Sequence, residues 1–225
     1  MTTMTADVGT DEAQAEVAAR SVLYRELASA LRFPSDKSHH AVLSGELRTV
    51  LGDCVSLLPY AFEDADRLVA GIATGEQDYD LFQSEYVGLF DVGAGGPPCP
   101  LYGGAWGGDR QKVMEETLRF YRFFGLTISS EQRELPDQLS TELEFLHFLT
   151  FRELEALEDG TDTGSLRRAS RDFLGRHPAR WLTKADAKLG SLDAGAPWCA
   201  LIGFAAAYCR ADAAHLVATE GPMKD

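Results

Sequence analysis

Apolar residues recur every three or four positions along most of this chain, and no run of alternating β-branched residues is visible. Pro34 ends the first such segment, and proline commonly stops a helix. The helical segments expected from this period cover residues 11–33, 41–51, 59–73, 79–90, 110–124, 136–157, 165–176, 179–189 and 197–217. We therefore predict an all-α, single-domain helical bundle of about eight or nine helices over residues 11–225, after a disordered tail at residues 1–10.

Residues 136–157 carry the clearest of these patterns. The apolar face consists of two adjoining stripes, Leu139, Leu143, Leu146 and Leu149 beside Phe145, Phe148 and Phe151. A face this wide predicts a helix packed between neighbours. Pro136 is a favoured first-turn residue, and Asp137 beside it would bind free backbone N–H groups.

The helix expected over residues 110–124 has signals at both ends. Asp109 is a good N-cap residue, and Gly125 follows the last apolar position. Residues 91–108, which come just before it, are rich in glycine and proline and predict a loop between two core helices. A flexible lid over a groove is the other interpretation, with Tyr102 and Trp106 as aromatic contacts.

Composition narrows the class of protein. The 225 residues are 45% hydrophobic, which predicts a globular chain, and the net charge is −14. This acidity disfavours nucleic acid and anionic membranes as main partners, because both attract clustered Lys and Arg. The most apolar uncharged run, residues 194–209, contains Pro197 and is shorter than the ~20 residues of a membrane span. We expect no stable membrane insertion.

The cellular location expected from the sequence is the cytoplasm. The N-terminal residues include no basic and apolar export signal. The four cysteines are Cys54, Cys99, Cys199 and Cys209, and no two of them form a CxxC pair. This scatter favours a reducing compartment and predicts neither a disulfide framework nor a zinc site.

Two patterns raise the alternative of an enzyme with a di-metal or nucleotide site. Glu144-x-x-His147 has the spacing of di-iron bundles, but the only other loose match is Asp212-x-x-His215, with the wrong acid. The glycine-rich loop lacks the Gly-Lys-Ser/Thr ending of a P-loop and follows a helix instead of a strand. We expect no metal, no cofactor and no catalytic residue, and keep the enzyme as the alternative.

Tyr86, Leu89 and Phe90 lie on one face at the end of the helix expected over residues 79–90. Spacing alone leaves two interpretations open, because such a trio can belong to the core or contact a partner. No pair of acids and no serine elbow nearby suggests catalysis.

Ordered motifs across residues 86–149 resemble one known family. The motifs are Tyr86-x-x-Leu89-Phe90, Pro98-Cys99-Pro100-Leu101-Tyr102, residues 119–126 (RFYRFFGL), residues 135–139 (LPDQL) and residues 142–149 (ELEFLHFL). Together they resemble the TorD/DmsD/NarJ chaperones that mature molybdoenzymes. The PCPLYGG version is similar to the delta-subunit chaperones of the dimethyl sulfide and ethylbenzene dehydrogenase and selenate and chlorate reductase type.

The resemblance implies an all-helical, TorD-like cytoplasmic protein that is not an enzyme. Such chaperones bind the twin-arginine signal region of a molybdopterin-containing catalytic subunit, assist cofactor insertion and proofread the precursor before export. The peptide-binding residues expected on this basis are Tyr86, Leu89, Phe90, Pro98, Tyr102, Trp106, Pro136, Asp137 and Gln138. Gln138 stands where the family has histidine, so a proton-dependent role at this position is not expected.

The acidic composition suits this partner. Paired arginines followed by an apolar stretch would meet carboxylates and then apolar side chains. A plain structural subunit of a respiratory complex is a third hypothesis. The client's substrate, contact with the molybdenum cofactor, and the choice between a monomer and a domain-swapped dimer stay open.

Overall fold

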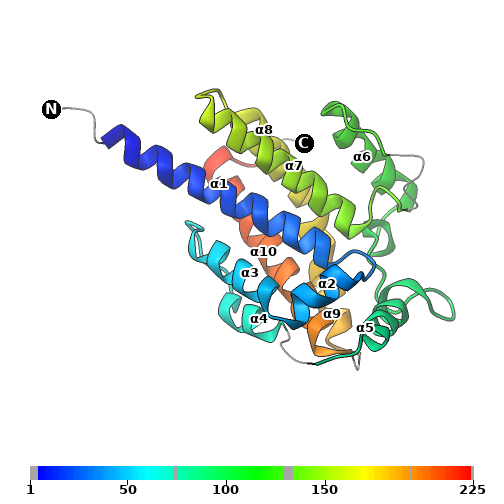
Figure 1. Cartoon of the computed structure of the whole chain (residues 1–225). Helices are drawn as coiled ribbons and strands as arrows, with labels where there is room; N and C mark the ends of the chain where they lie inside the picture. The colour runs from blue at the N-terminus through cyan, green and yellow to red at the C-terminus, as the bar shows by residue number, and fades with distance from the viewer. Residues whose placement is uncertain (1–4, 73–75, 129–133, 193, 224–225) are drawn as a thin grey trace.

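The computed structural model describes residues 5–72, 76–128, 134–192 and 194–223. Its α-helices are α1 (Thr5–Ala30), α2 (Asp36–Leu43), α3 (Glu46–Ser56), α4 (Ala65–Gly71), α5 (Tyr79–Tyr86), α6 (Arg110–Phe123), α7 (Leu139–Glu158), α8 (Gly164–Arg176), α9 (Pro178–Leu189) and α10 (Ala196–Glu220). A π-helical turn, Val87–Asp91, and a 3-10 turn, Gly103–Ala105, complete the described elements. The prediction of an all-α bundle is confirmed (Figure 1).

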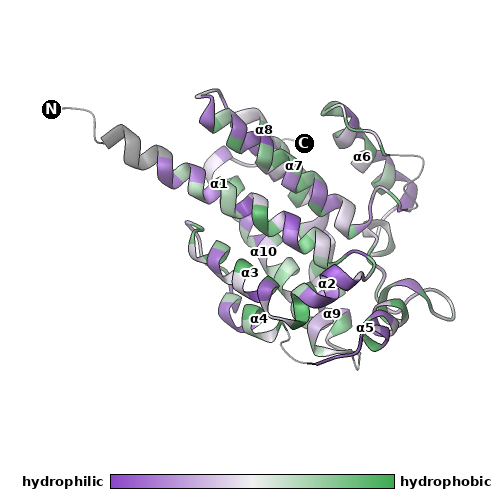
Figure 2. Ribbon diagram, in the orientation of Figure 1, coloured by the Kyte–Doolittle hydropathy of each residue, from purple (hydrophilic) through white to green (hydrophobic). Residues whose placement is uncertain are grey.

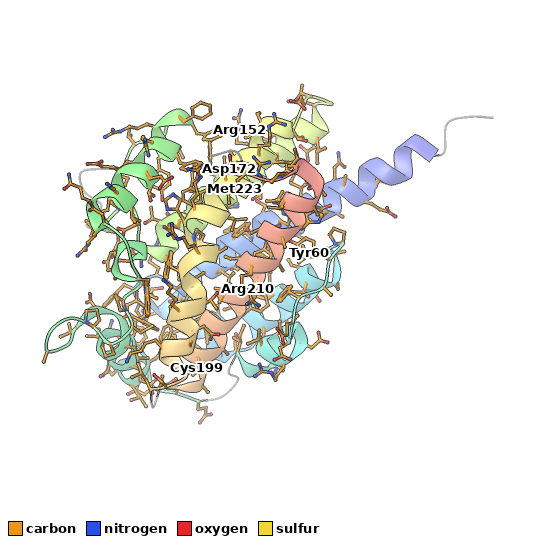
Figure 3. All side chains as sticks on the ribbon, turned by 180° about the vertical axis from the view of Figure 1, so that it is seen from behind. Tyr60, Arg152, Asp172, Cys199, Arg210 and Met223 are labelled. Carbon is orange, nitrogen blue, oxygen red and sulfur yellow. The ribbon has the colours of Figure 1, made fainter. Side chains whose placement is uncertain are left out.

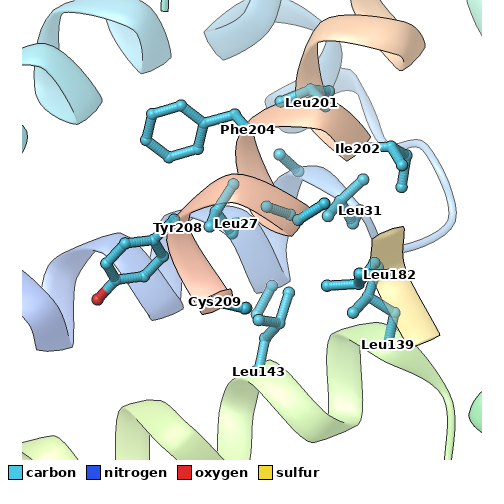
Figure 4. Packing of buried hydrophobic residues seen from close by; sticks show 14 of the residues in the cluster. Leu27, Leu31, Leu139, Leu143, Leu182, Leu201, Ile202, Phe204, Tyr208 and Cys209 are labelled. Carbon is cyan, nitrogen blue, oxygen red and sulfur yellow. The ribbon is translucent and has the colours of Figure 1, made fainter. Parts of the chain in front are cut away.

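Helix α10 runs through the middle of the bundle, and α1 and α7 pack side by side across it (Figure 1). The close-up in Figure 4 shows where leucines from different helices meet around α10. They come from α1 (Leu27, Leu31), α7 (Leu139, Leu143), α9 (Leu182) and α10 (Leu201), and all are buried. The expected core helix over residues 197–217 is therefore observed, extended to Ala196–Glu220.

Helix α7 also has the wide apolar face expected of it. Leu139, Leu143, Leu146 and Leu149 are fully buried. The adjoining phenylalanines are less uniform, since Phe145 is buried, Phe148 is half-buried and Phe151 is 47% exposed. The ribbon coloured by hydropathy shows polar and apolar residues alternating along α1 and α7 (Figure 2).

A buried ion cluster joins the central helices. The Arg20 guanidinium on α1 donates to both carboxylate oxygens of Asp212 on α10, at 2.7 and 3.2 Å, and to Glu153 Oε2 on α7 at 3.2 Å. The Tyr60 hydroxyl, from the α3–α4 connection, donates to Asp212 Oδ1 at 2.7 Å and lies beside α10 (Figure 3). These bonds satisfy charges that burial would otherwise make very costly.

The helix expected over residues 41–51 is wrong, because this stretch spans α2 and α3. Ser35 caps α2 through a reciprocal bond with Ser38, so that helix begins five residues earlier than expected. Gly45 then adopts φ +84, a left-handed conformation that ends one helix and precedes the next. The segment expected to be one helix is thus a helical hairpin.

The helix expected over residues 59–73 is shorter in the structure. It begins only at Ala65, because Tyr60 bonds Asp212 and Phe62 packs on Phe204 at 5.6 Å between ring centroids. Residue 73 lies outside the described part of the chain. Long-range contacts thus hold residues 59–64 in an irregular path that the local pattern does not reveal.

The chain ends bear on two further expectations. Helix α1 begins at Thr5, so residues 5–10 follow a helical path, while residues 1–4 lie outside the described part. The tail at residues 1–10 stays a prediction. None of the helices in the described ranges is long and apolar enough to span a bilayer.

Candidate functional site

The start of α7 and the loop that precedes α6 are joined by a short backbone ladder. The Asp137 carbonyl oxygen accepts from Gly103 N at 2.8 Å, and Leu139 N donates to the Leu101 carbonyl at 2.8 Å. The Asp137 carboxylate adds a third bond, because its Oδ2 accepts from Gly104 N at 2.9 Å. Two segments more than 30 residues apart therefore meet with fixed register at Asp137, which is fully buried.

Gln138 is the N-cap residue of α7. Its side-chain oxygen accepts from Ser140 N at 2.6 Å and Thr141 N at 3.3 Å, which satisfies free N–H groups of the first turn. The expectation that the helix starts at Pro136 is wrong: Pro136 and Asp137 precede the cap. The reason is that Asp137 bonds the distant Gly104 instead of its own helix.

The aromatic residues of the loop are half-buried at this junction. The Tyr102 hydroxyl donates to Glu134 Oε2 at 2.9 Å, and Trp106 Nε1 donates to the Pro100 carbonyl at 2.8 Å. The Trp106 ring stacks on Trp181 of α9, with centroids 6.4 Å apart and planes 10° from parallel. Each ring is thus held by a polar bond and keeps part of its surface open.

The trio Tyr86, Leu89 and Phe90 lies at the change from α5 to the π-helical turn. Tyr86 is 5% exposed and Phe90 is 2% exposed, and both pack edge-on against Trp198 of α10. Leu89 is half-buried, and its carbonyl accepts from Cys99 N at 2.9 Å. In this conformation Leu89 offers surface to a partner, whereas the two rings belong to the core.

Pro98 is exposed, and Cys99 beside it is buried. The Cys99 Sγ lies 3.6 Å from the Ala185 carbonyl, and burial raises the pKa of this thiol to about 12. A thiol that stays protonated at neutral pH is a poor nucleophile. Cys99 therefore fills space in the turn.

Sequence reasoning missed a pair of buried titratable groups under the junction. Glu142 is fully buried on α7; its Oε2 accepts from Trp181 Nε1 at 3.1 Å, and its Oε1 has no hydrogen-bond partner within the described residues. Burial raises the pKa of Glu142 well above its usual range. The sequence did contain a signal for the burial of Glu142. This residue lies three positions after Leu139 and four before Leu146, and both leucines lie on the buried face of α7.

His177 is the second of these groups. It is 2% exposed between α8 and α9, with Nδ1 3.3 Å from the Thr117 hydroxyl and 3.9 Å from Glu142 Oε1. Burial lowers the pKa of His177 to about 4. Burial therefore disfavours the charged form of both side chains.

The residues that raised the metal alternative point to other partners. Glu144 pairs with Arg32, and the His147 ring contacts the hydroxyl and carbonyl of Ser21. Asp212 is engaged by Arg20. Among the residues that the structure describes, no group of three His, Cys, Asp or Glu side chains is placed to hold a metal ion. The arrangement suits binding through shape and hydrogen bonds.

Comparison with known proteins gives a family and several relatives. A family model described as "Nitrate reductase delta subunit" matches residues 55–186. The selenate reductase assembly chaperone protein of Thauera selenatis is 40% identical over 125 residues, which cover 55% of this chain and 65% of the relative, just under two thirds of its length. The perchlorate reductase assembly chaperone protein of Dechloromonas aromatica (strain RCB) is 32% identical over 190 residues, covering 83% of this chain and 85% of that protein.

One further relative and one solved structure are similar. The chlorate reductase assembly chaperone protein of Ideonella dechloratans is 40% identical over 129 residues, covering 55% of this chain and 67% of the relative. The crystal structure of a putative redox enzyme maturation protein from Archaeoglobus fulgidus aligns with a TM-score of 0.46 and 18% identity, over 88% of this chain and 93% of that one. At that score the structural likeness adds nothing to the assignment.

Proposed function

Because this chain belongs to the nitrate reductase delta subunit family, we propose that it is an assembly chaperone for a molybdopterin-containing oxidoreductase and not an enzyme. The observation that carries the proposal is the match to the perchlorate reductase assembly chaperone, which spans most of both chains. The family agrees with the resemblance drawn from the motifs in residues 86–149. Burial disfavours the charged forms of Glu142 and His177 and keeps the Cys99 thiol protonated, which is consistent with a protein that acts by binding.

The proposed partner is the precursor of the catalytic subunit, recognised through its twin-arginine signal region in the cytoplasm. The chaperone would hold this region until the cofactor is inserted and then release the precursor for export. A net charge of −14 supports the choice of a basic partner, because complementary charge speeds association and excludes acidic competitors. Arginine pairs bind carboxylates with two parallel hydrogen bonds, which lysine cannot reproduce.

The site residues enter the proposal in two groups. Leu89, Pro98, Tyr102 and Trp106 keep exposed surface and would contact the peptide directly. The second group shapes that surface from beneath, and its members are Tyr86, Phe90, Pro136, Asp137 and Gln138. A direct contact by Tyr86 or Phe90 would need the end of α5 to open, since both rings are sealed against Trp198.

Titration calorimetry tests the partner. The probe is a twin-arginine leader peptide from a molybdopterin-containing catalytic subunit, and a matched control peptide has the paired arginines replaced by lysines. We expect saturable binding of the arginine peptide and affinity weaker by about tenfold for the lysine peptide, the loss of about 1.4 kcal/mol. Absence of binding by both peptides, with the chaperone folded, would contradict leader recognition.

A further inference from the structure

Two adjoining surface concavities lie along α7, one toward the end of α6 and one toward the start of α8; together we call them the α6–α7 groove. The first, about 250 Å³, is lined by Tyr121, Leu126, Thr127, Ile128, Thr141, Glu144, Phe145 and Phe148. The second, about 930 Å³, is lined by Phe124, Phe148, Arg152, Glu155, Ala156, Glu158, Asp159, Thr161, Asp162, Ser165 and Leu166. Phe148 lines both, so the two concavities adjoin at this side chain. Helix α6 stands at the edge of the bundle, beyond α7 (Figure 1).

The first concavity has a fixed apolar floor. Phe145 contacts Phe124 at 5.8 Å and Phe148 at 6.3 Å between ring centroids. Tyr121 packs on Phe145 at 4.8 Å, and its hydroxyl donates to the Pro136 carbonyl at 2.9 Å. This bond ties the floor to the junction at Asp137. An apolar surface that is already ordered costs a ligand little entropy on binding.

The second concavity is acidic and lies at the carboxyl end of α7. Glu155, Glu158 and the C-cap Asp159 gather there, and no basic residue occupies the last turn. The helix dipole places further negative partial charge at the same end. Among the described residues that line this concavity, Arg152 is the one basic residue, labelled at the top of Figure 3, and it pairs with Glu155 at 3.3 Å. Glu158 and Asp159 are exposed and form no ion pair within the described residues.

Large apolar side chains continue beyond the groove. Phe123, the last residue of α6, is 83% exposed and contacts Phe124 edge-on at 5.1 Å between ring centroids. An exposed phenylalanine next to an apolar concavity is typical of a surface that a partner covers. The order along α7 is thus a carboxylate-rich end followed by an aromatic trough.

We propose that the α6–α7 groove is a second contact surface for the client's leader. It holds the basic-then-apolar segment, with the arginines at Glu158 and Asp159 and the apolar stretch over Phe148, Phe145 and Leu126. The surface at Leu89, Pro98, Tyr102 and Trp106 then contacts the residues that flank this segment. This proposal rests on the proposed function and assigns it a second binding surface. The order of charge along the groove supports the proposal. The acidic concavity adjoins the apolar concavity at Phe148, and in the leader a basic segment likewise adjoins an apolar segment. A second copy of this chain fits less well, because each copy carries a net charge of −14.

Matched variants test the apolar half. Phe148→Ser and Leu126→Asp change the trough, while Phe151→Ser removes the same type of residue from the same helix outside it. With the arginine leader peptide as probe, we expect affinity to fall about tenfold or more in the first two and to change less than about twofold in the third. Leu126 lies outside the helices, so we expect Leu126→Asp to remain folded. This variant tests the groove even if Phe148→Ser does not fold.

The acidic half has its own control. Glu158→Lys with Asp159→Lys should weaken leader binding severalfold at low salt, and the loss should shrink as salt rises. Asp53→Lys with Asp66→Lys makes the same change in net charge on α3 and α4, far along the chain from the groove, and should leave the affinity nearly unchanged. Equal loss in both double variants would show that only the overall charge matters and would overturn the placement.

Photocrosslinking separates this inference from the proposed function. A leader peptide carrying a photoreactive phenylalanine in its apolar stretch should label residues of α7 and residues 124–128. If labelling is confined to residues 86–106 and the Phe148→Ser and Leu126→Asp variants bind with wild-type affinity, the groove is not a binding surface. The proposal that this chain recognises the leader would still hold. A chain that forms dimers abolished by Leu126→Asp, and that binds no peptide, would assign the groove to a second copy.

Discussion

The carboxylate of Asp137 holds the backbone of Gly104, with Oδ2 accepting from Gly104 N at 2.9 Å. The contact is tight, because a Cβ built on Gly104 would lie 2.8 Å from Arg110 Cγ and 3.1 Å from both Arg110 Cα and Asp137 Oδ2. The first residue of α6 is thus packed onto the loop that Asp137 anchors. One side chain sets the distance between the starts of α6 and α7, and hence the shape of the surface between them.

Asp137→Ala should therefore destabilise the chain. It leaves the half-buried Gly104 N–H without its carboxylate acceptor, and we expect a loss of about 1 kcal/mol or more in the free energy of unfolding, measured by urea denaturation. Asp137→Asn keeps an oxygen acceptor and should lose less. Leader affinity should follow the same order, since the groove floor bonds Pro136 through Tyr121. If the two variants are equally stable, the bond to Gly104 contributes nothing measurable.

Glu142 predicts a specific dependence of stability on pH. Burial raises the folded-state pKa of Glu142 well above its usual value, so the folded chain retains a proton that the unfolded chain releases above about pH 4.3. Protonated Glu142 contributes its full stabilisation below about pH 4.3, and this contribution is lost as the pH rises toward the folded-state pKa of Glu142. Glu142→Gln cannot ionise, so its unfolding free energy relative to wild type should increase between about pH 5 and pH 8.

The measurement is urea denaturation at several pH values, with Glu115→Gln as the control. Glu115 is exposed on α6, and its side chain bonds only Gln111 within the described residues. The unfolding free energy of Glu115→Gln relative to wild type should therefore not change with pH. His177 acts in the opposite direction below about pH 6.5, because burial lowers its pKa to about 4 and protonation then favours unfolding. The His177 effect is present in wild type and variant alike. A flat Glu142→Gln difference would argue against a neutral, buried Glu142.

The Arg20–Asp212 pair should be the most costly buried contact to break. Asp212→Asn leaves the Arg20 charge with Glu153 alone and should cost about 3–5 kcal/mol. Burial favours a raised pKa for Asp212, but the charge of Arg20, with bonds from Tyr24 and Tyr60, lowers it overall. A lowered acid pKa stabilises the fold at neutral pH, and that stability is lost as pH falls below about 4. The difference in the free energy of unfolding between Asp212→Asn and wild type should therefore become smaller below about pH 4.

The exposed Asp66→Asn is the comparison for this experiment. Surface substitutions of this kind change stability by about 0.5 kcal/mol or less. Should Asp212→Asn be no worse than Asp66→Asn at neutral pH, the ion cluster would have no net stabilising role.

The Tyr86–Phe90 segment allows folding and binding effects to be separated. Phe90→Ala removes a ring packed at 5.7 Å from Trp198 and should cost about 3–5 kcal/mol. Leu89→Ala, half-buried, should cost less and should weaken leader binding if the proposed contact exists. Melting temperature and calorimetry on both variants provide the two readouts. Unchanged affinity in a folded Leu89→Ala would remove Leu89 from the binding surface.

Local signals predicted some elements closely. Asp109 caps α6 by accepting from Gln111 N at 3.0 Å and Lys112 N at 3.4 Å, and Gly125 follows the helix at φ +74, both as expected. These features depend on neighbouring residues alone. Gly45 was missed as a break between α2 and α3, because apolar spacing continues across it. Helix α4 was predicted too long because Tyr60 and Phe62 bind partners on α10, far along the chain.

The candidate site shows the same division. The motif that contains Asp137 and Gln138 was recognisable, but its bonds to Gly103 and Gly104 join segments over 30 residues apart. Phe148 was expected only as part of an apolar stripe, and its position in an open trough depends on where α6 ends. Exposure is a property of the packed molecule and cannot be read from residue type.

By itself the sequence determined the all-helical class, the caps of α6, the acidic surface and the family. Each follows from periodicity, composition or local motif, which act over a few residues or over the chain as a whole. Only the tertiary structure decided that Tyr86 and Phe90 pack against Trp198, that Glu142 and His177 are buried together, and that the groove along α7 stays open. The physical reason is that burial and desolvation depend on which distant segments meet.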